Sequence, residues 1–320
     1  MIKIDLVTGF LGAGKTTFIL QYARHLISKG EKIAILENDY GAVNIDALLL
    51  AGLESDLCEI ETVAGGCDHD CHVRRFRTKL ISMGMRGFNR VIVEPSGIFD
   101  VDEFFDVLHD EPLERWYEAG NVIAVMDAYT IQDNLSRDAR YFFMSETARA
   151  GILLLSHIQK MDHSHIRYDA ISFVNRSMEM FGCDRRYSDK DILVKDWAEL
   201  TEEDYDRITS CGFHLCDHIK LSLEDNNDFS SVYFMNHSMT VSTMEMVARD
   251  LFHTDTTGSV FRVKGFHFEN GSWYELNASG SGCMVNKSIA GQEVFIVIGE
   301  CLVESEIRKF VEKAAMAGDD

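Results

Sequence analysis

The chain has 320 residues, 46% of them hydrophobic and 26% charged, which is typical of a globular protein with one large domain or two smaller ones. Its formal net charge of −21 argues against nucleic acid or an anionic membrane as the main partner, and its apolar runs are too short to cross a membrane. Eight cysteines without a secretory signal, and a glycine-rich motif beginning at residue 9, lead us to expect thiols and a cytoplasmic location.

The first two predicted elements are the strand IKIDLV and the helix TTFILQYARHLI, joined by the glycine-rich turn GFLGAGKT. This turn fits the P-loop pattern G-x-x-x-x-G-K-[ST], whose backbone N–H groups cradle phosphates before the positive end of a helix. Lys15 would contact the outer phosphates and the Thr16 hydroxyl would bind Mg²⁺. The residues predicted to bind nucleotide here are Gly9, Gly12, Ala13, Gly14, Lys15, Thr16 and Thr17. The alternative, a plain β–α turn, does not need the Gly-Lys-Thr ending.

Strand-like and helix-like segments continue to alternate through the first half of the chain. Further strands are predicted at 32–39, 57–65, 90–97, 121–128 and 151–158, and a helix at 72–85. Apolar strands separated by helices predict an α/β fold, with a mostly parallel sheet covered by helices on both faces. Because ligands of such sheets bind at the carboxyl ends of the strands, we expect Asp39, Glu94 and Ser156 to lie near the P-loop.

Two acidic residues at strand ends are the predicted catalytic partners of Lys15. Asp39 can bind Mg²⁺ directly or through water, or orient the attacking water, although a solvated strand-end acid is the alternative. Glu94 ends an apolar strand in the Walker-B position, where burial of a carboxylate is costly unless a cation or hydrogen bonds offset it. Gly97 follows it, and its N–H could approach the γ-phosphate.

The run Cys67-Asp68-His69-Asp70-Cys71-His72 consists entirely of residue types that ligate metals, and it precedes a predicted helix. Two thiolates with an imidazole suit Zn²⁺ and also Co²⁺. The predicted ligands are Cys67, His69, Cys71 and His72, and the choice among His69, Asp70 and His72 as the completing ligand stays open. The alternative is a polar helix cap with a half-buried thiol.

The loop predicted to recognise the base follows the strand at 151–158, and its motif can be aligned in two ways. In the first, Ser156, His157 and Gln159 form the motif SHIQ, and the glutamine carbonyl accepts hydrogen bonds from the base. In the second, QKMD, Asp162 supplies a carboxylate three residues later. We favour SHIQ because it directly follows the strand. A neutral amide accepts more weakly than a carboxylate, so GTP preference is reduced and ATP use stays open.

The character of the chain changes after about residue 195. The stretch DWAELTEEDYDRITSCGF is acidic and is typical of a surface helix or a linker, and we expect an acidic linker at 201–230. Helical and strand-like segments bounded by Gly, Asn and Ser then predict a smaller α+β domain at 231–320.

The motifs TGFLGAGKTT, ENDYGAVNID, GGCDHDCHVR, VIVEPSGI and VFRVKGF, in this order, resemble the CobW-type family of P-loop GTPases, metallochaperones related to nitrile hydratase activators. The resemblance implies a nucleotide domain at 1–200 and a CobW-like domain at 231–320. It also implies GTP and Mg²⁺ as cofactors, Zn²⁺ or Co²⁺ as cargo, and a metalloenzyme or cofactor-assembly protein as recipient. The chain departs from the family in having C-x-x-x-C-H for C-x-C-C and SHIQ for [NT]-K-x-D.

The expected function is that of a cytoplasmic P-loop NTPase, GTP-hydrolysing, that binds a divalent transition metal and delivers it to a partner protein. A nucleotide-dependent homodimer is compatible with this function. Two other classes stay open: a P-loop small-molecule kinase or ATPase, and a nucleotide-dependent assembly factor that transfers no metal.

Overall fold

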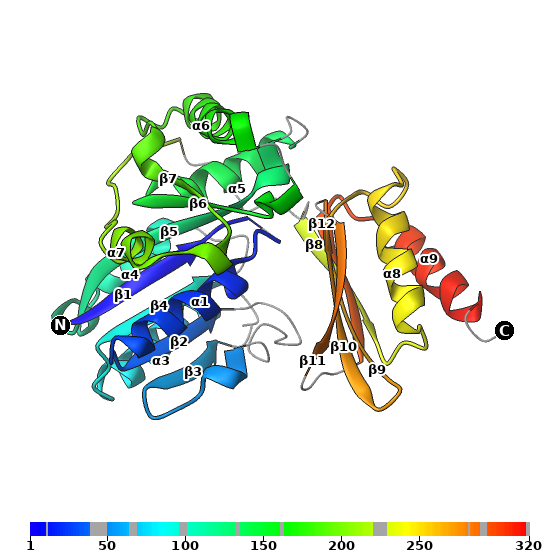
Figure 1. Cartoon of the computed structure of the whole chain (residues 1–320), viewed down its shortest axis with the longest axis horizontal. Helices are drawn as coiled ribbons and strands as arrows, with labels where there is room; N and C mark the ends of the chain where they lie inside the picture. The colour runs from blue at the N-terminus through cyan, green and yellow to red at the C-terminus, as the bar shows by residue number, and fades with distance from the viewer. Residues whose placement is uncertain are drawn as a thin grey trace. The chain divides into compact units, whose positions relative to one another are not determined.

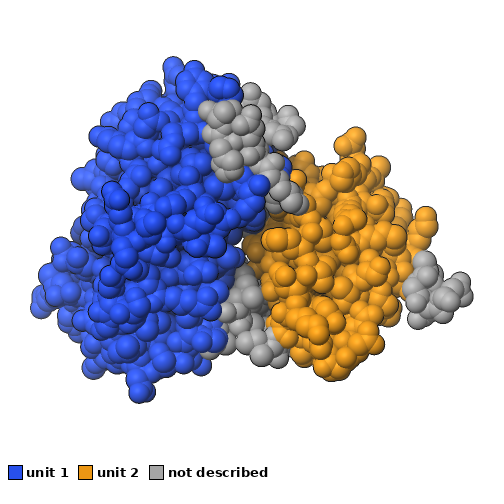
Figure 2. All heavy atoms as spheres, viewed as in Figure 1, with its two compact units in different colours: residues 1–220 blue, residues 221–320 orange. Residues whose placement is uncertain are grey.

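Apolar strands that alternate with amphipathic helices organise the larger part of the fold. The computed structural model describes residues 1–320 except 11, 39–49, 64–68, 96–100, 132–134, 161–162, 220–228, 281, 289–292 and 318–320. The chain divides into two compact units, unit 1 at Met1–Lys220 and unit 2 at Leu221–Asp320, which Figure 2 shows in blue and orange.

Unit 1 is built on a seven-stranded parallel sheet with the order β3-β2-β4-β1-β5-β6-β7 (Figure 1). The strands are β1 (Ile2–Thr8), β2 (Ile33–Asn38), β3 (Cys58–Val63), β4 (Arg90–Pro95), β5 (Tyr117–Asp127), β6 (Ile152–Ser156) and β7 (Ile192–Val194). The helices are α1 (Lys15–Ser28), α3 (His69–Gly84), α4 (Val101–His109), α5 (Arg137–Ala148), α6 (His163–Met180) and α7 (Glu202–Thr209). β4 and β6 are buried along their whole lengths, as expected of strands covered on both faces. The predicted α/β fold class is confirmed.

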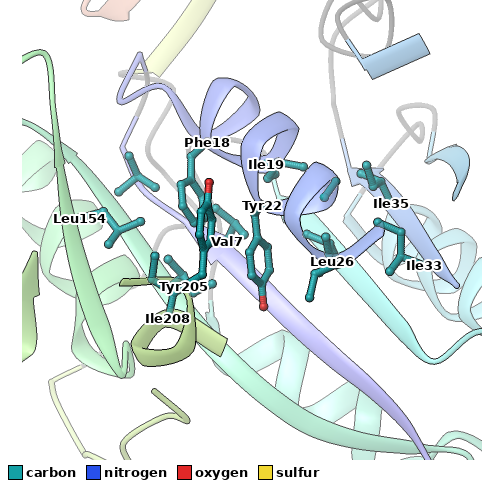
Figure 3. Packing of buried hydrophobic residues seen from close by; sticks show 14 of the residues in the cluster. Val7, Phe18, Ile19, Tyr22, Leu26, Ile33, Ile35, Leu154, Tyr205 and Ile208 are labelled. Atoms are coloured by element: carbon teal, nitrogen blue, oxygen red, sulfur yellow. The ribbon is translucent and has the colours of Figure 1, made fainter. Parts of the chain in front are cut away.

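Helix α1 packs its apolar side chains onto the sheet and forms a hydrophobic core cluster of unit 1. Phe18, Ile19 and Tyr22 have no exposed surface, and their spacing of one, three and four residues places them on one face of the helix. They meet Val7 of β1 and Ile35 of β2 (Figure 3). Each such burial contributes about 1.5–3 kcal/mol relative to an exposed side chain, so this packing fixes the helix and the residues at its amino end.

The connections around β1 place a ligand site at its carboxyl end. β1 lies between β4 and β5, with Leu6 opposite Val93 and Thr8 opposite Ala124. From β1 the chain passes through α1 to β2 on one side, whereas it later passes from β4 through α4 to β5 on the other side. Such a reversal of direction is the switch point at which open α/β sheets bind their ligands. The glycine-rich turn begins there.

A buried ionic network stabilises the middle of the same sheet. The Asp5 carboxylate on β1 is fully buried and accepts hydrogen bonds from Arg90 Nη1 at 2.6 Å and Tyr22 Oη at 2.7 Å. Its other oxygen accepts from the backbone and side-chain nitrogens of Asn121, at 2.8 and 3.1 Å. Burial, and then the Asp5 charge, raise the pKa of Tyr22 well above its ordinary value. Every partner of this carboxylate comes from a different element, so the network ties α1, β4 and β5 to β1.

Substitution of Arg90 by alanine is expected to lower the free energy of unfolding by about 3–5 kcal/mol, because it leaves the Asp5 carboxylate buried without its counter-charge. Urea denaturation followed by circular dichroism measures the change. The matched control is Lys29→Ala, which removes an ion pair with Glu202 whose side chains are 51% and 67% exposed, and which should barely alter stability. Equal effects of the two substitutions would contradict a structural role for the network.

The acidic segment that begins at residue 201 starts as a helix, the other alternative for this stretch, and not as the expected linker. Residues 201–209 form a capped helix in unit 1, in which the Thr201 and Asp204 side chains each accept a hydrogen bond from the other residue's backbone N–H. Tyr205 and Ile208 of α7 join the core around α1. The acidic composition hides these two core positions because the remaining residues of the helix are polar and exposed or half-buried.

Unit 2 is an antiparallel sheet with two helices packed on it. Its strands, in the order β11-β10-β9-β12-β8, are β8 (Phe229–Met235), β9 (Ser259–Glu269), β10 (Ser272–Ser279), β11 (Gly282–Ser288) and β12 (Val294–Glu300). The helices α8 (Val241–Phe252) and α9 (Glu304–Ala317) lie side by side against this sheet (Figure 1). Val247 and Ile307 from the helices pack with Val263, Leu276 and Phe295 from the sheet. In the described part of the chain no helix has the length and apolarity needed to cross a membrane.

Candidate nucleotide-binding site

The glycine-rich turn joins the carboxyl end of β1 to the first residue of α1. Gly9, Gly12 and Gly14 have φ angles of 142°, 80° and 89°, a region that favours glycine. A Cβ atom at Gly9 would lie 2.2 Å from the carbonyl oxygen of Val125, so a side chain there would displace backbone. Ala13 is buried, whereas Leu11 lies outside the described residues. The turn therefore has the glycine-dependent backbone that a phosphate cradle requires.

Lys15 and Thr16 lie at the amino end of α1 with their side chains largely buried. Lys15 Nζ donates to the carbonyl oxygen of Gly9 at 2.6 Å, so the ammonium group lies over the turn itself. The hydroxyl of Thr16 donates to Glu94 Oε1 at 2.7 Å, which joins the P-loop to the end of β4. Only 7%, 6% and 6% of Lys15, Thr16 and Glu94 are exposed, so they form one shielded cluster. Thr17, in the first turn of α1, is exposed.

A second carboxylate adjoins this cluster. Glu37 on β2 is the register partner of Glu94 on β4, and it is only 2% exposed. Asp39, and not Glu37, was predicted from the sequence as the catalytic acid at the end of this strand, although the position of Glu37 one residue before the end of β2 was the available signal. The two buried carboxylates at adjacent strand ends and the Thr16 hydroxyl on Glu94 offer oxygen ligands of the kind that Mg²⁺ takes. The predicted residues Asp39 and Gly97 lie outside the described residues.

The loop after β6 contains the residues predicted to face the base. Ser156 Oγ donates to the carbonyl oxygen of Met126 at 3.3 Å, which holds it against β5. His157 has a φ angle of 54°, and its Nδ1 lies 3.0 Å from Asp127 Oδ2. This backbone conformation ends the strand and directs the chain into a short turn, η4 (Ile158–Lys160).

Gln159 lies in this turn and is exposed. Its Nε2 donates to Asp196 Oδ2 at 2.8 Å, and Asp196 follows the neighbouring strand β7. The alternative base residue Asp162 lies outside the described residues. Asp196 could not be predicted from the sequence, because only the pairing of β6 with β7 brings it close to Gln159.

The run of predicted metal ligands lies at the amino end of α3. Cys71 is half-buried and His72 is 1% exposed, while Cys67 and the side chains of His69 and Asp70 lie outside what the structure describes. Among the described side chains, no group of three or more His, Cys, Asp or Glu residues is placed to hold a metal ion. The seven cysteines that the structure describes are thiols. The metal site thus remains a prediction from the sequence.

Comparison with known proteins gives a family for this arrangement. Residues 3–180 match the family model of the CobW/HypB/UreG nucleotide-binding domain. The chain is 24% identical over 283 residues to the zinc chaperone YjiA of Escherichia coli (strain K12), which covers 84% of this chain and 83% of that protein. It is 32% identical over 155 residues to the zinc chaperone YeiR of the same organism, covering 48% and 46% of the two chains. The crystal structure of Zn(II)-bound YjiA GTPase from E. coli aligns with a TM-score of 0.37 at 19% identity, over 99% and 98% of the two chains.

Proposed function

The chain belongs to the CobW/HypB/UreG family, and on that premise we propose that it hydrolyses GTP and carries a divalent transition metal, Zn²⁺ or Co²⁺, to a recipient protein. Relatives named zinc chaperones favour Zn²⁺. The recipient is a metalloenzyme or a cofactor-assembly protein, and the location is the cytoplasm. A nucleotide-dependent homodimer is compatible with this function.

The observation that carries the proposal is the shielded cluster of Lys15, Thr16 and Glu94 at the switch point of the sheet. A triphosphate entering the P-loop would replace the Gly9 carbonyl as the partner of Lys15 Nζ and accept from the N–H groups at the start of α1. Thr16 and Glu94 would hold Mg²⁺, which, when bound, neutralises charge on the phosphate oxygens. The cluster thus stabilises charge at the position where hydrolysis develops it.

In hydrolysis a water molecule attacks the γ-phosphorus, and the bond between the γ-phosphorus and the oxygen that bridges it to the β-phosphate breaks. The products are GDP and phosphate. In this proposal Asp39 orients the water, and the N–H of Gly97 donates to the γ-phosphate. Ser156, His157 and Gln159 border the base. These roles rest on the sequence motifs and on the position of the loops at the carboxyl ends of β2, β4 and β6.

The cargo metal is proposed to bind Cys67 and Cys71, with His69 or His72 completing the site and Asp70 as the other candidate. The run lies between β2 and β4 in the sequence, so both segments that would contact the γ-phosphate flank it. A γ-phosphate that orders these segments would order the metal ligands, and loss of phosphate would release them. This is how nucleotide hydrolysis would be coupled to metal delivery.

Anaerobic titration of the full chain with Zn²⁺, alone and with Mg²⁺-GTP or Mg²⁺-ATP, tests the proposal. We expect Zn²⁺ to bind more tightly when GTP is present, and we expect phosphate release on the same samples. Steady hydrolysis together with the same Zn²⁺ affinity without nucleotide, with Mg²⁺-GTP and with Mg²⁺-ATP would contradict the chaperone function. The NTPase activity would still be supported. Transfer of phosphate to a small-molecule acceptor would instead favour a kinase.

A further inference from the structure

The segment after β7, which the sequence did not connect with the nucleotide site, places the Asp196 carboxylate beside the turn that follows β6. β6 and β7 are adjacent and parallel, so the turns that follow them, η4 and η6 (Trp197–Glu199), lie at the same edge of the sheet. Gln159 of η4 donates to Asp196, the residue immediately before η6, at 2.8 Å. In the motif SHIQ, Gln159 stands where [NT]-K-x-D has its aspartate. The Gln159 amide donates a hydrogen bond to another aspartate, Asp196.

Two hydrogen bonds orient the Asp196 carboxylate. Its Oδ1 accepts from the backbone N–H of Ala198 at 2.9 Å, which makes Asp196 the cap of η6, and its Oδ2 accepts from Gln159. Each carboxylate oxygen has a second lone pair, so the group retains acceptor capacity for a ligand. The neighbouring cation, Lys195, pairs with Asp204 at 2.6 Å. Asp196 is half-buried, which makes it accessible from one side.

The residue after Asp196 connects this carboxylate to the P-loop. The Trp197 ring atom Cη2 lies 3.0 Å from the position that a Cβ would occupy at Gly14, and the ring meets Phe18 of α1 with centroids 5.7 Å apart. The Cβ of Ser156 lies 3.9 Å from the same point. A nucleotide with its phosphates on the N–H groups of Gly14 and Lys15 therefore has the ends of β6 and β7 beside it. Its sugar and base would extend toward η4 and η6.

We propose that Asp196, oriented by Gln159, is the carboxylate that recognises guanine, an inference that rests on the proposed GTPase function. Guanine presents two adjacent donors, N1–H and the N2 amino group, which match the two oxygens of a carboxylate. Adenine presents its N6 amino donor beside the N1 acceptor, which a carboxylate repels. Selectivity for GTP over ATP is thus restored without the aspartate of [NT]-K-x-D.

Asp196→Asn tests this assignment because asparagine retains an oxygen that can cap η6. Its amide N–H₂ can donate to the C2 carbonyl of xanthine, which replaces the amino group of guanine. Competition binding of GTP, ATP and XTP against a fluorescent GDP analogue, with Mg²⁺ present, should show GTP favoured over ATP by about tenfold or more in the wild type. Asp196→Asn should weaken GTP about tenfold or more and strengthen XTP by a similar factor.

Asp206→Asn is the matched control, because it alters an exposed carboxylate of the nearby helix α7, leaves the pair of Lys195 with Asp204 in place, and should leave all three affinities unchanged. Gln159→Leu, which removes the orienting hydrogen bond, should lower the ratio of GTP to ATP affinity severalfold without a change in Tm. GTP binding by Asp196→Asn at wild-type affinity would overturn the inference and leave the GTPase proposal standing. The same holds if Asp162→Asn, and not Asp196→Asn, gains XTP. Failure of the wild type to bind any triphosphate would instead contradict the proposed function.

Discussion

Lys15→Ala is expected to lower the rate of GTP hydrolysis by about two to three orders of magnitude, the range measured for removal of one preorganised group that stabilises developing charge. The ammonium group lies 2.6 Å from the Gly9 carbonyl and is largely shielded from water, so its charge would act on the outer phosphates in a medium of low dielectric constant. Phosphate release at saturating Mg²⁺-GTP measures the loss.

The fold of the Lys15→Ala variant should be retained, because the core contacts of α1 come from Phe18, Ile19 and Tyr22 rather than from Lys15. Thermal unfolding checks this point. Lys29→Ala removes a lysine from the other end of the same helix, where it is 51% exposed, and should hydrolyse GTP at the wild-type rate. Hydrolysis by Lys15→Ala within a few-fold of wild type would remove the P-loop assignment.

The parallel sheet could be predicted because its strands are short apolar runs with both faces buried. The segments 32–39, 90–97 and 151–158 correspond to β2, β4 and β6, and each contains the observed strand. Such strands can be predicted from their own residues alone, because burial on both faces requires a continuous run of apolar residues. The family resemblance, carried by the ordered motifs, is confirmed by the family model.

Elements with a weaker local signal escaped prediction. β7 has only three residues, too few to show a period, and it becomes a strand by pairing with β6. β11 has a mostly polar sequence, GCMVNKS, and its residues alternate between exposed and half-buried, because it is an edge strand in register with β10. The acidic sequence of helix α7 is typical of a surface helix or a linker, and only its packing against α1 reveals Tyr205 and Ile208 as core residues. In each case tertiary pairing outweighs local composition.

The candidate site was predictable where one motif contains all its residues and not where separate elements supply them. The P-loop lies within eight consecutive residues, so its lysine and threonine are read directly from the sequence. The bond between Thr16 and Glu94 spans 78 positions, and that between Gln159 and Asp196 spans 37. Glu94 could be inferred from its strand-end position, whereas Asp196 follows a strand that the sequence does not reveal.

The prediction that most directly tests metal delivery concerns the thiols at the start of α3. Because the Cys67–His72 run lies between the segments that would contact the γ-phosphate, Zn²⁺ or Co²⁺ should bind more tightly in the presence of Mg²⁺-GTP. Linkage requires that the metal tighten GTP binding by the same factor, and roughly 5–150-fold is typical of such coupling. Co²⁺ is the convenient probe, because thiolate ligation gives a sulfur-to-metal charge-transfer absorption. Anaerobic titrations in both orders measure the two factors independently.

Cys67→Ser combined with Cys71→Ser should abolish the charge-transfer band and the coupling, while Mg²⁺-GTP binding stays close to wild type, because Lys15, Thr16 and Glu94 are untouched. The matched control is Cys283→Ser with Cys301→Ser, which removes two thiols from unit 2 and should leave both the band and the coupling in place. Full Co²⁺ affinity in the first double variant would exclude these thiols as the cargo site. Equal Co²⁺ affinity of the wild type with and without GTP would instead contradict the coupling of metal delivery to nucleotide. In the first case the Cys67–His72 run would serve only to cap α3, and in the second nucleotide hydrolysis would be coupled to a process other than metal delivery.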